Sequence, residues 1–198
     1  MKLAHYLHEG TIRVGVVDND FVFDLQEAQL KLQLHFPRPT RTIDEILANG
    51  MLSILQETEK RIIESVPGMP VTSVTLRSPI LNPEKILLLA VNYHSHSKEQ
   101  KTEPAKEPYL FTKFRNTLIG PGEAILLPRV SRKVDWEVEL AVIIGKVGKY
   151  VSRKDALNHV AGYAVANDVS FRDLQYSTRL PDGKTRMGLN WVKGKGLD

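Results

Sequence analysis

The first 25 residues alternate between apolar and polar positions in short runs, a pattern typical of β-strands joined by tight turns. Residues 3–7 and 11–17 form two such runs, and His8-Glu9-Gly10 between them is a turn sequence. A second turn at residues 18–20 leads into a third apolar run at 21–23. The pattern predicts a small antiparallel meander at the N-terminus.

Two helices are predicted after the meander. Thr42 can cap a helix with Glu45 three residues later, and Asn49-Gly50 supplies a stop signal. Residues 51–65 place apolar side chains at helical spacing opposite a charged face. A Pro-Gly-Met-Pro linker at 67–70 then suggests two parts, a small N-terminal α/β module at 1–75 and a second domain at 76–198.

The second part is rich in short apolar runs that predict strands, with a short helix beginning between Ser152 and Asp155. Helical crossovers between these runs are scarce, which favours an α+β fold with a mostly antiparallel sheet over a doubly wound one. The predicted strands are residues 85–91, 109–113, 124–127, 135–144 and 162–169.

Composition narrows the classes of protein. The 198 residues are 42% hydrophobic and 25% charged, which is typical of a globular chain. The absence of cysteine excludes disulfides, thiol catalysis and cysteine-ligated metals. The longest apolar run, 86–91, is too short to cross a membrane, and the first residues lack a signal-peptide pattern, so we expect a cytoplasmic protein without membrane contact.

The net charge of +4 lies in the second half of the chain. Residues 1–100 carry a net charge of −2, whereas 101–170 and 171–198 each carry +3. Such an excess could attract nucleic acid or a small anionic substrate. Because no block of consecutive Lys and Arg occurs, we expect no nucleic-acid binding.

The sequence Asp135-Trp136-Glu137-Val138-Glu139 holds the strongest chemical signal. In one strand, residues 135, 137 and 139 share a face, and the apolar residues that follow predict burial of both faces. Carboxylates side by side on a buried strand repel each other, and a hard divalent cation would relieve that repulsion. The alternative is a half-exposed strand whose acids face water or Lys and Arg partners. Asp168, at the end of another strand, is either a further ligand or a helix cap.

His96 and Glu99 follow the predicted strand 85–91. Their spacing of three would let the carboxylate orient and polarise the imidazole on one helical turn, as in a general base. His94 and His96 could instead bind zinc or lie in a surface loop.

Taken in order, four motifs resemble the fumarylacetoacetate hydrolase family, in particular its short bacterial members with a small N-terminal module. The resemblance covers about residues 80–198. The motifs are Asn92-Tyr93-x-x-His96-x-x-Glu99, Trp136-Glu137-x-Glu139-Leu140-Ala141, Asn167-Asp168-Val169-Ser170-x-Arg172-Asp173-x-Gln175 and Lys195-Gly196-x-Asp198.

The resemblance implies a rolled, mixed and mostly antiparallel β-sheet that binds Mg²⁺ or Mn²⁺, with Ca²⁺ as a third candidate. It also implies that Lys195 stabilises negative charge on the substrate, and that His96, oriented by Glu99, activates water or moves a proton. The implied metal ligands are Glu137, Glu139 and Asp168, and the implied substrate-binding residues are Lys113, Arg172 and Gln175.

The implied activity is metal-dependent hydrolysis or lysis of carbon–carbon bonds in 2-oxo acids such as acylpyruvates, by a homodimer. Three alternatives stay open: an isomerase or decarboxylase of 2-hydroxyhepta-2,4-diene-1,7-dioate, an oxaloacetate decarboxylase, and an inactive structural or binding subunit. In the family, the motif with Lys195 leads into further core strands, so we expect the chain ending at Asp198 to lack the C-terminal part of the catalytic domain.

Overall fold

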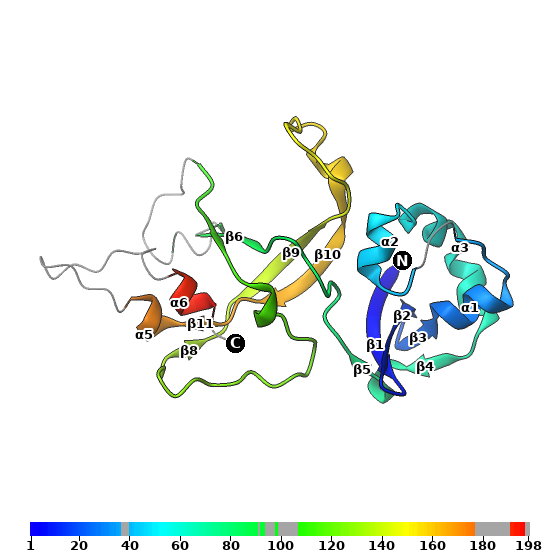
Figure 1. The fold of residues 1–198 in the computed structure, drawn as a ribbon, viewed down its shortest axis with the longest axis horizontal. Coiled ribbons are helices and arrows are strands. Elements are labelled where there is room, and N and C mark those ends of the chain that lie inside the picture. Colours follow the sequence, from blue (N-terminus) through cyan, green and yellow to red (C-terminus); the bar gives the residue numbers. More distant parts are fainter. Residues whose placement is uncertain (37–39, 91, 94–97, 99–106, 177–190, 197–198) are drawn as a thin grey trace, which may run out of the picture. The chain divides into compact units, whose positions relative to one another are not determined.

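The structure is a computed structural model, and it describes residues 1–36, 40–90, 92–93, 98, 107–176 and 191–196. The chain divides into two compact units, coloured along the sequence in Figure 1. The first comprises Met1–Asn82, Ile119–Ala124 and Leu140–Ala166; the second comprises Pro83–Leu118, Ile125–Glu139 and Asn167–Asp198. The division into an N-terminal module at 1–75 and a domain at 76–198 stays a prediction.

A five-stranded antiparallel sheet, in the order β4-β3-β2-β1-β5, forms the centre of the first unit. The predicted meander is confirmed, with Lys2 opposite Val17 and His8 opposite Thr11. The predicted linker at 67–70 is instead strand β4, because its backbone pairs with β3. The strands are β1 (Lys2–His8), β2 (Thr11–Asp18), β3 (Phe21–Asp24), β4 (Gly68–Pro70) and β5 (Thr75–Leu76), and a 3-10 turn, η1 (Val71–Ser73), joins the last two.

Both predicted helices are present as α2 (Ile43–Ala48) and α3 (Leu52–Ser65). The Thr42 hydroxyl accepts a hydrogen bond from the Glu45 N–H at 3.1 Å, which confirms the predicted cap. A third helix, α1 (Leu25–Lys31), was not expected, although the Asp24 carboxylate caps it by accepting from the Glu27 N–H at 2.7 Å. An acidic cap followed three residues later by Glu is a signal that could have revealed this helix.

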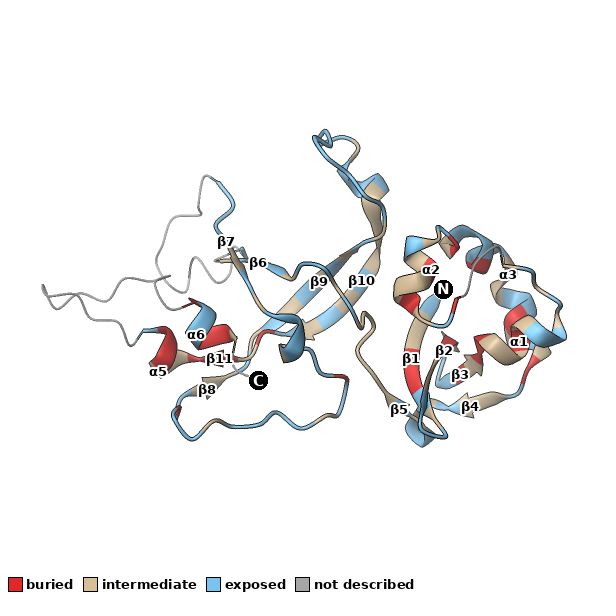
Figure 2. Ribbon diagram, viewed as in Figure 1, coloured by how far each residue is buried: buried red, intermediate tan, exposed pale blue. Residues whose placement is uncertain are grey.

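The first unit has an apolar core between the sheet and the helices (Figure 2). The side chains of Val14 and Val16 on β2 face Leu25 on α1 and Leu55 and Ile62 on α3, and all five are fully buried. Their burial provides the main driving force for folding this unit, at about 25 cal/mol per Å² of apolar surface removed from water.

The second part of the chain is built of short strands in two-stranded antiparallel pairs, β6 with β7 and β8 with β11. Of the described residues in the predicted strand 85–91, only 87–89 form a strand. Residues 124–127 form no strand, because no neighbouring strand pairs with them. The elements are β6 (Leu87–Leu89), β7 (Leu110–Thr112), η2 (Arg115–Thr117), β8 (Val134–Asp135), β11 (Ser170–Phe171), α5 (Arg172–Gln175) and α6 (Trp191–Lys195).

The predicted strand 135–144 is interrupted at Trp136 and Glu137. Its first part, β8, pairs with β11, whereas β9 (Val138–Ile144) pairs with β10 (Val160–Asn167) to form a hairpin that includes η3 (Ala156–His159). The prediction that both faces of this segment are buried is wrong, since Val138 and Leu140 are 64% and 58% exposed. Among the described residues, that face of β9 is therefore largely exposed.

The predicted α+β class is confirmed by helices packed on antiparallel sheet in the first unit and by antiparallel strand pairs in the rest of the chain. In the portion of the chain that the structure describes, no helix has both the length and the apolar character needed to cross a membrane.

His5 on β1 links three segments of the first unit and is fully buried. Its Nδ1 lies 2.9 Å from the Ser78 carbonyl, and its Nε2 accepts from the Ile43 N–H at 2.9 Å. A carbonyl only accepts, so Nδ1 carries the proton and the ring is neutral. Burial lowers the pKa of His5 below 6.5, against the hydrogen bond to Ser78 and the charge of Asp44, which raise it.

We therefore expect the free energy of unfolding to be lower at acidic pH. The contribution of His5 is complete above pH 6.5, the unperturbed value, and is lost as the pH falls below it, because the unfolded chain then binds the extra proton. His5→Gln should remove this pH dependence, and leaving the Ile43 N–H unsatisfied in His5→Leu should cost about 1–3 kcal/mol. Urea unfolding between pH 5 and 8 measures the free energy of unfolding and its dependence on pH. His8→Gln is the control. If the free energy of unfolding fell as steeply with decreasing pH in His5→Gln as in the wild-type chain, His5 would not be the group responsible.

Candidate active site

The side-chain ammonium of Lys195 lies between two carboxylates. Its Nζ is 2.7 Å from Glu137 Oε2 and 2.6 Å from Asp168 Oδ2. The side chains of Lys195 and Asp168 are 1% and 2% exposed, so this ion pair is shielded from water. A buried carboxylate must be paired or hydrogen-bonded, and here one cation serves two of them.

Backbone pairing explains why the two carboxylates meet. Glu137 precedes β9 and Asp168 follows β10, so the two residues lie at the open end of one hairpin. The Asp168 N–H donates to the Glu137 carbonyl at 2.8 Å, and the Glu137 N–H donates to the side-chain oxygen of Asn167 at 3.1 Å. The hairpin therefore fixes their separation before any ion binds.

A second ammonium group, that of Lys113, also contacts Asp168. Its Nζ donates to Asp168 Oδ1 at 2.9 Å and to the Val169 carbonyl at 3.0 Å. Lys113 follows β7, whereas Lys195 lies on α6, so cations from two separate elements hold the two oxygens of one carboxylate.

The guanidinium of Arg172 binds the other side of the cluster. It pairs with Glu137 and Asp135, with 2.9 Å to Asp135 Oδ2, and donates to Gln175 Oε1 at 3.1 Å. Arg172 is the first residue of α5, and its backbone N–H donates to the Lys133 carbonyl at 2.8 Å. Arg172 and Gln175, two of the implied substrate-binding residues, therefore lie on one helical turn and contact each other.

Burial and charge have opposite effects on the two glutamates. Burial opposes ionisation of Glu137, but the hydrogen bond and charge of Lys195, together with Arg172, hold the pKa of Glu137 below its usual value. The pKa of Glu139 is raised by burial and by the negative charges of Glu137 and Asp168, which the hydrogen bond to Tyr93 and the charge of Lys195 only partly offset.

The donor types suit a hard divalent cation, because Glu137, Glu139 and Asp168 offer only carboxylate oxygens. Two of these carboxylates converge on a single cationic atom, and the third feels their negative charge. Among the described residues, no three acidic or histidine side chains lie in an arrangement that could hold a metal ion. The oxygen chemistry of these three residues therefore suits a divalent cation, and their assignment as metal ligands stays a prediction.

Six predicted site residues are brought together by these contacts: Lys113, Glu137, Asp168, Arg172, Gln175 and Lys195. His96 and Glu99 lie outside the described residues, and their role as proton-transfer pair stays a prediction.

Two aromatic residues of the site were not predicted. Phe111 on β7 and Trp191 on α6 stack with ring centroids 4.5 Å apart, and both rings face the Lys195 ammonium, at 5.2 and 5.8 Å from Nζ. Trp191 precedes Lys195 by four residues, a spacing that places both on one helix face and could have revealed half of this pair.

Asp135 was grouped with Glu137 and Glu139 by strand alternation. The interruption at residues 136–137 places it instead on β8, where it pairs with Arg172. The expected grouping is nevertheless present, since the Arg172 guanidinium contacts both Asp135 and Glu137, and residues 135, 137 and 139 are partly buried whereas residues 136, 138 and 140 are exposed.

Comparison with known proteins supports the resemblance. The family model described as fumarylacetoacetate (FAA) hydrolase C-terminal matches residues 85–198. A mitochondrial oxaloacetate tautomerase of Bos taurus is 40% identical over 162 residues, which cover 82% of this chain and 49% of that protein. A Homo sapiens counterpart is 38% identical over 169 residues, covering 85% and 51%. The chain thus spans about half the length of these curated relatives.

Solved structures support the fold. A fumarylacetoacetate hydrolase from Exiguobacterium antarcticum matches with a TM-score of 0.74 at 27% identity, over 100% of this chain and 62% of that one. A maleylpyruvate hydrolase from Sphingobium, in complex with manganese(II) and pyruvate, matches with a TM-score of 0.67 at 29% identity, over 87% and 60%. The predicted fold class is confirmed by these likenesses.

A substitution at Gly194 tests how the packing of α6 positions Lys195. A Cβ at Gly194 would lie 2.6 Å from Gln175 Cβ and 2.8 Å from its Cα, so α6 packs backbone against α5 at this point. We expect Gly194→Ala to lower the free energy of unfolding by about 1–3 kcal/mol, because the helices must separate. Chemical unfolding measures the loss. Val192→Ala, on the exposed side of α6, is the control, and equal small effects would show that the contact is not tight.

Proposed function

Because the chain belongs to the fumarylacetoacetate hydrolase family, we propose that it supports divalent-metal-dependent hydrolysis or lysis of carbon–carbon bonds in 2-oxo acids of the acylpyruvate type. The supporting observation is the convergence of Glu137 and Asp168 on one cation position, surrounded by further positive side chains. Since the chain spans about half of its relatives, the activity is proposed for the protein that contains this segment.

The proposed metal is Mg²⁺ or Mn²⁺, with Ca²⁺ as a third candidate. Manganese is bound in the Sphingobium maleylpyruvate hydrolase. Glu137, Glu139 and Asp168 would hold the ion, whose chemistry is to polarise the carbonyl and carboxylate oxygens of a bound 2-oxo acid.

The remaining polar residues are assigned to substrate and proton handling. Arg172 and Lys113 carry positive charge beside the carboxylates and suit the binding of an anionic 2-oxo acid. Gln175 is 2% exposed, and its contact with Arg172 orients the guanidinium. His96, polarised by Glu99, would move the proton, and Lys195 would stabilise negative charge that develops on the substrate.

A second candidate is tautomerisation of oxaloacetate. The two relatives described above, 40% and 38% identical, are named oxaloacetate tautomerases, whereas the two solved hydrolase structures are 27–29% identical. Both reactions remove or add a proton at the carbon beside a 2-oxo group, so one set of residues can serve either. Assembly as a homodimer and a cytoplasmic location remain predictions, and the two tautomerases above are named as mitochondrial.

Glu137→Gln tests the metal assignment. This change removes one carboxylate charge at nearly constant shape, so Mg²⁺ and Mn²⁺ binding should weaken by at least about tenfold. Isothermal titration calorimetry with each chloride salt measures the affinity. Glu84→Gln, an exposed change of the same kind, is the control. If both variants bound metal like the wild-type chain, Glu137 would not be a ligand.

His96→Ala tests the proposed proton transfer. With Mg²⁺ or Mn²⁺ present, turnover of an acylpyruvate and tautomerisation of oxaloacetate should fall by about 10²–10⁴-fold, the usual contribution of a general base. Loss of ultraviolet absorbance of each enol gives the rates, and chelation with EDTA should abolish both. Equal rates in the variant and the wild-type chain would exclude His96 as the base, and the faster substrate would distinguish the two candidate functions.

A further inference from the structure

Lys195 combines three properties that its proposed role on the substrate does not require. Its side chain is 1% exposed, and its ammonium contacts both carboxylates at 2.6–2.7 Å. It also faces two stacked aromatic rings. An ammonium whose only role was to contact the substrate would need to be accessible to the substrate, and burial between carboxylates and aromatic rings would not serve that role.

The aromatic pair fixes where the ammonium sits. Phe111 and Trp191 stack at an interplanar angle of 15°, and their electron-rich faces attract a nearby cation. Phe111 comes from β7, whereas Trp191 and Lys195 share α6, so the rings hold the charge from two elements. Lys195 and Trp191 are 1% and 9% exposed, so the aliphatic stem of Lys195 packs inside the protein and out of contact with solvent.

We propose that Phe111 and Trp191 are positioning residues that hold the Lys195 ammonium at the point where Glu137 and Asp168 converge, so that Lys195 acts as an internal cation that competes with a divalent metal for the same carboxylate oxygens. The inference rests on the proposed function, since it needs a metal that uses these oxygens. A divalent ion and an ammonium repel each other strongly at hydrogen-bonding distance, so each must weaken the binding of the other. The competition is reciprocal by linkage.

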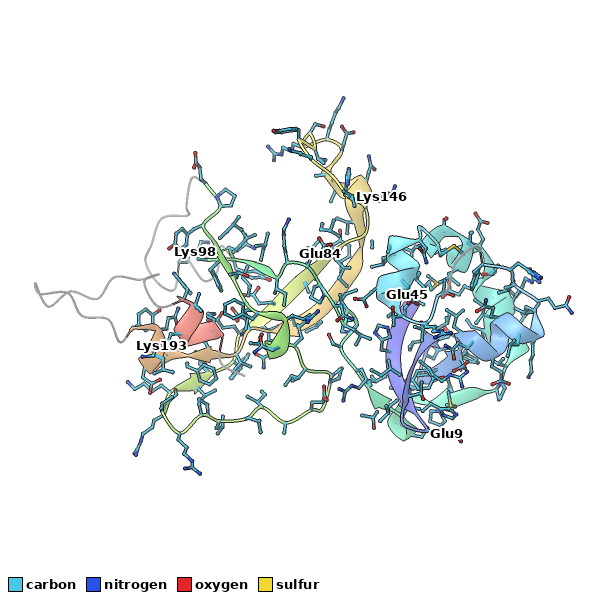
Figure 3. The ribbon with its side chains drawn as sticks, viewed as in Figure 1. Glu9, Glu45, Glu84, Lys98, Lys146 and Lys193 are labelled. Carbon is cyan, nitrogen blue, oxygen red and sulfur yellow. The ribbon has the colours of Figure 1, made fainter. Side chains whose placement is uncertain are left out.

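The competition predicts that removing the internal cation strengthens metal binding. We expect Lys195→Met to bind Mg²⁺ at least about fivefold more tightly than the wild-type chain in calorimetry. Lys193→Met is the matched control, because it removes the same charge from the same helix at an exposed position (Figure 3, where Lys193 is labelled). A general effect of net charge would tighten both variants equally and would overturn the inference.

The aromatic pair is tested by Trp191→Leu and Trp191→Phe. Leucine keeps apolar bulk but loses the ring face, so the ammonium should be displaced more easily and Mg²⁺ should bind more tightly; phenylalanine should restore wild-type affinity. A merely structural role for Trp191 would weaken metal binding in Trp191→Leu. This variant also keeps the inference testable if Lys195→Met, which leaves two carboxylates without their shared cation, does not fold.

Trp191 also reports displacement directly. The chain has two tryptophans, and Trp136 is 70% exposed. In the Trp136→Phe variant, Trp191 is therefore the single source of tryptophan fluorescence. Saturating Mg²⁺ should shift this emission, and the shift should vanish in the double variant with Lys195→Met. Binding in calorimetry without any shift in Trp191 emission overturns the inference and leaves the proposed function intact. If neither the wild-type chain nor the Lys195→Met and Trp191→Leu variants bound Mg²⁺, both this inference and the proposed function would be overturned.

Discussion

The enclosure of charge around Lys195 is the constraint on which the second unit depends. In the first unit, buried side chains are mainly aliphatic, whereas in the second unit Asp168, Ser170, Gln175 and Lys195 are buried beside only a few apolar residues (Figure 2). A core of this kind is stable only when each charge finds its partner, because an unpaired buried ion costs several kcal/mol. The short elements β8, β11, α5 and α6 are joined by these pairings, and β11, α5 and α6 each add one buried apolar side chain, Phe171, Leu174 and Trp191.

The two halves of the chain differ in how much of their structure could be predicted from the sequence. In the first unit, local rules reveal most elements: strand alternation gives the meander, and the Thr42 cap marks α2, although α1 and β4 were missed. In the second, the identities of the charged residues were readable, but not which carboxylate meets which cation. Periodicity placed Asp135 beside Glu137, but it did not reveal that both contact the guanidinium of Arg172. Such pairings join residues 27–58 positions apart and leave no trace in local periodicity.

The aromatic pair shows the same limit at the level of a single contact. Trp191 and Lys195 lie one helical turn apart, which is a local relation, but Phe111 reaches them from a distant strand. Acidic and basic residues indicate possible chemical roles by their residue type alone. Phenylalanine and tryptophan do not, because most of them only pack in the protein interior. Their role in positioning a charge is therefore visible only from three-dimensional contacts.

The open end of the β9–β10 hairpin has a consequence for how this fold can change over evolution. Glu137 and Asp168 are joined there by a backbone hydrogen bond, while the far end closes at Gly145 and His159, whose backbones also pair. Residues 146–158 beyond that closure can therefore gain or lose length without moving the carboxylates apart. An insertion within β9 or β10 themselves would turn every following side chain to the opposite face. We accordingly expect natural length variation to concentrate in the tip of the hairpin, away from its base.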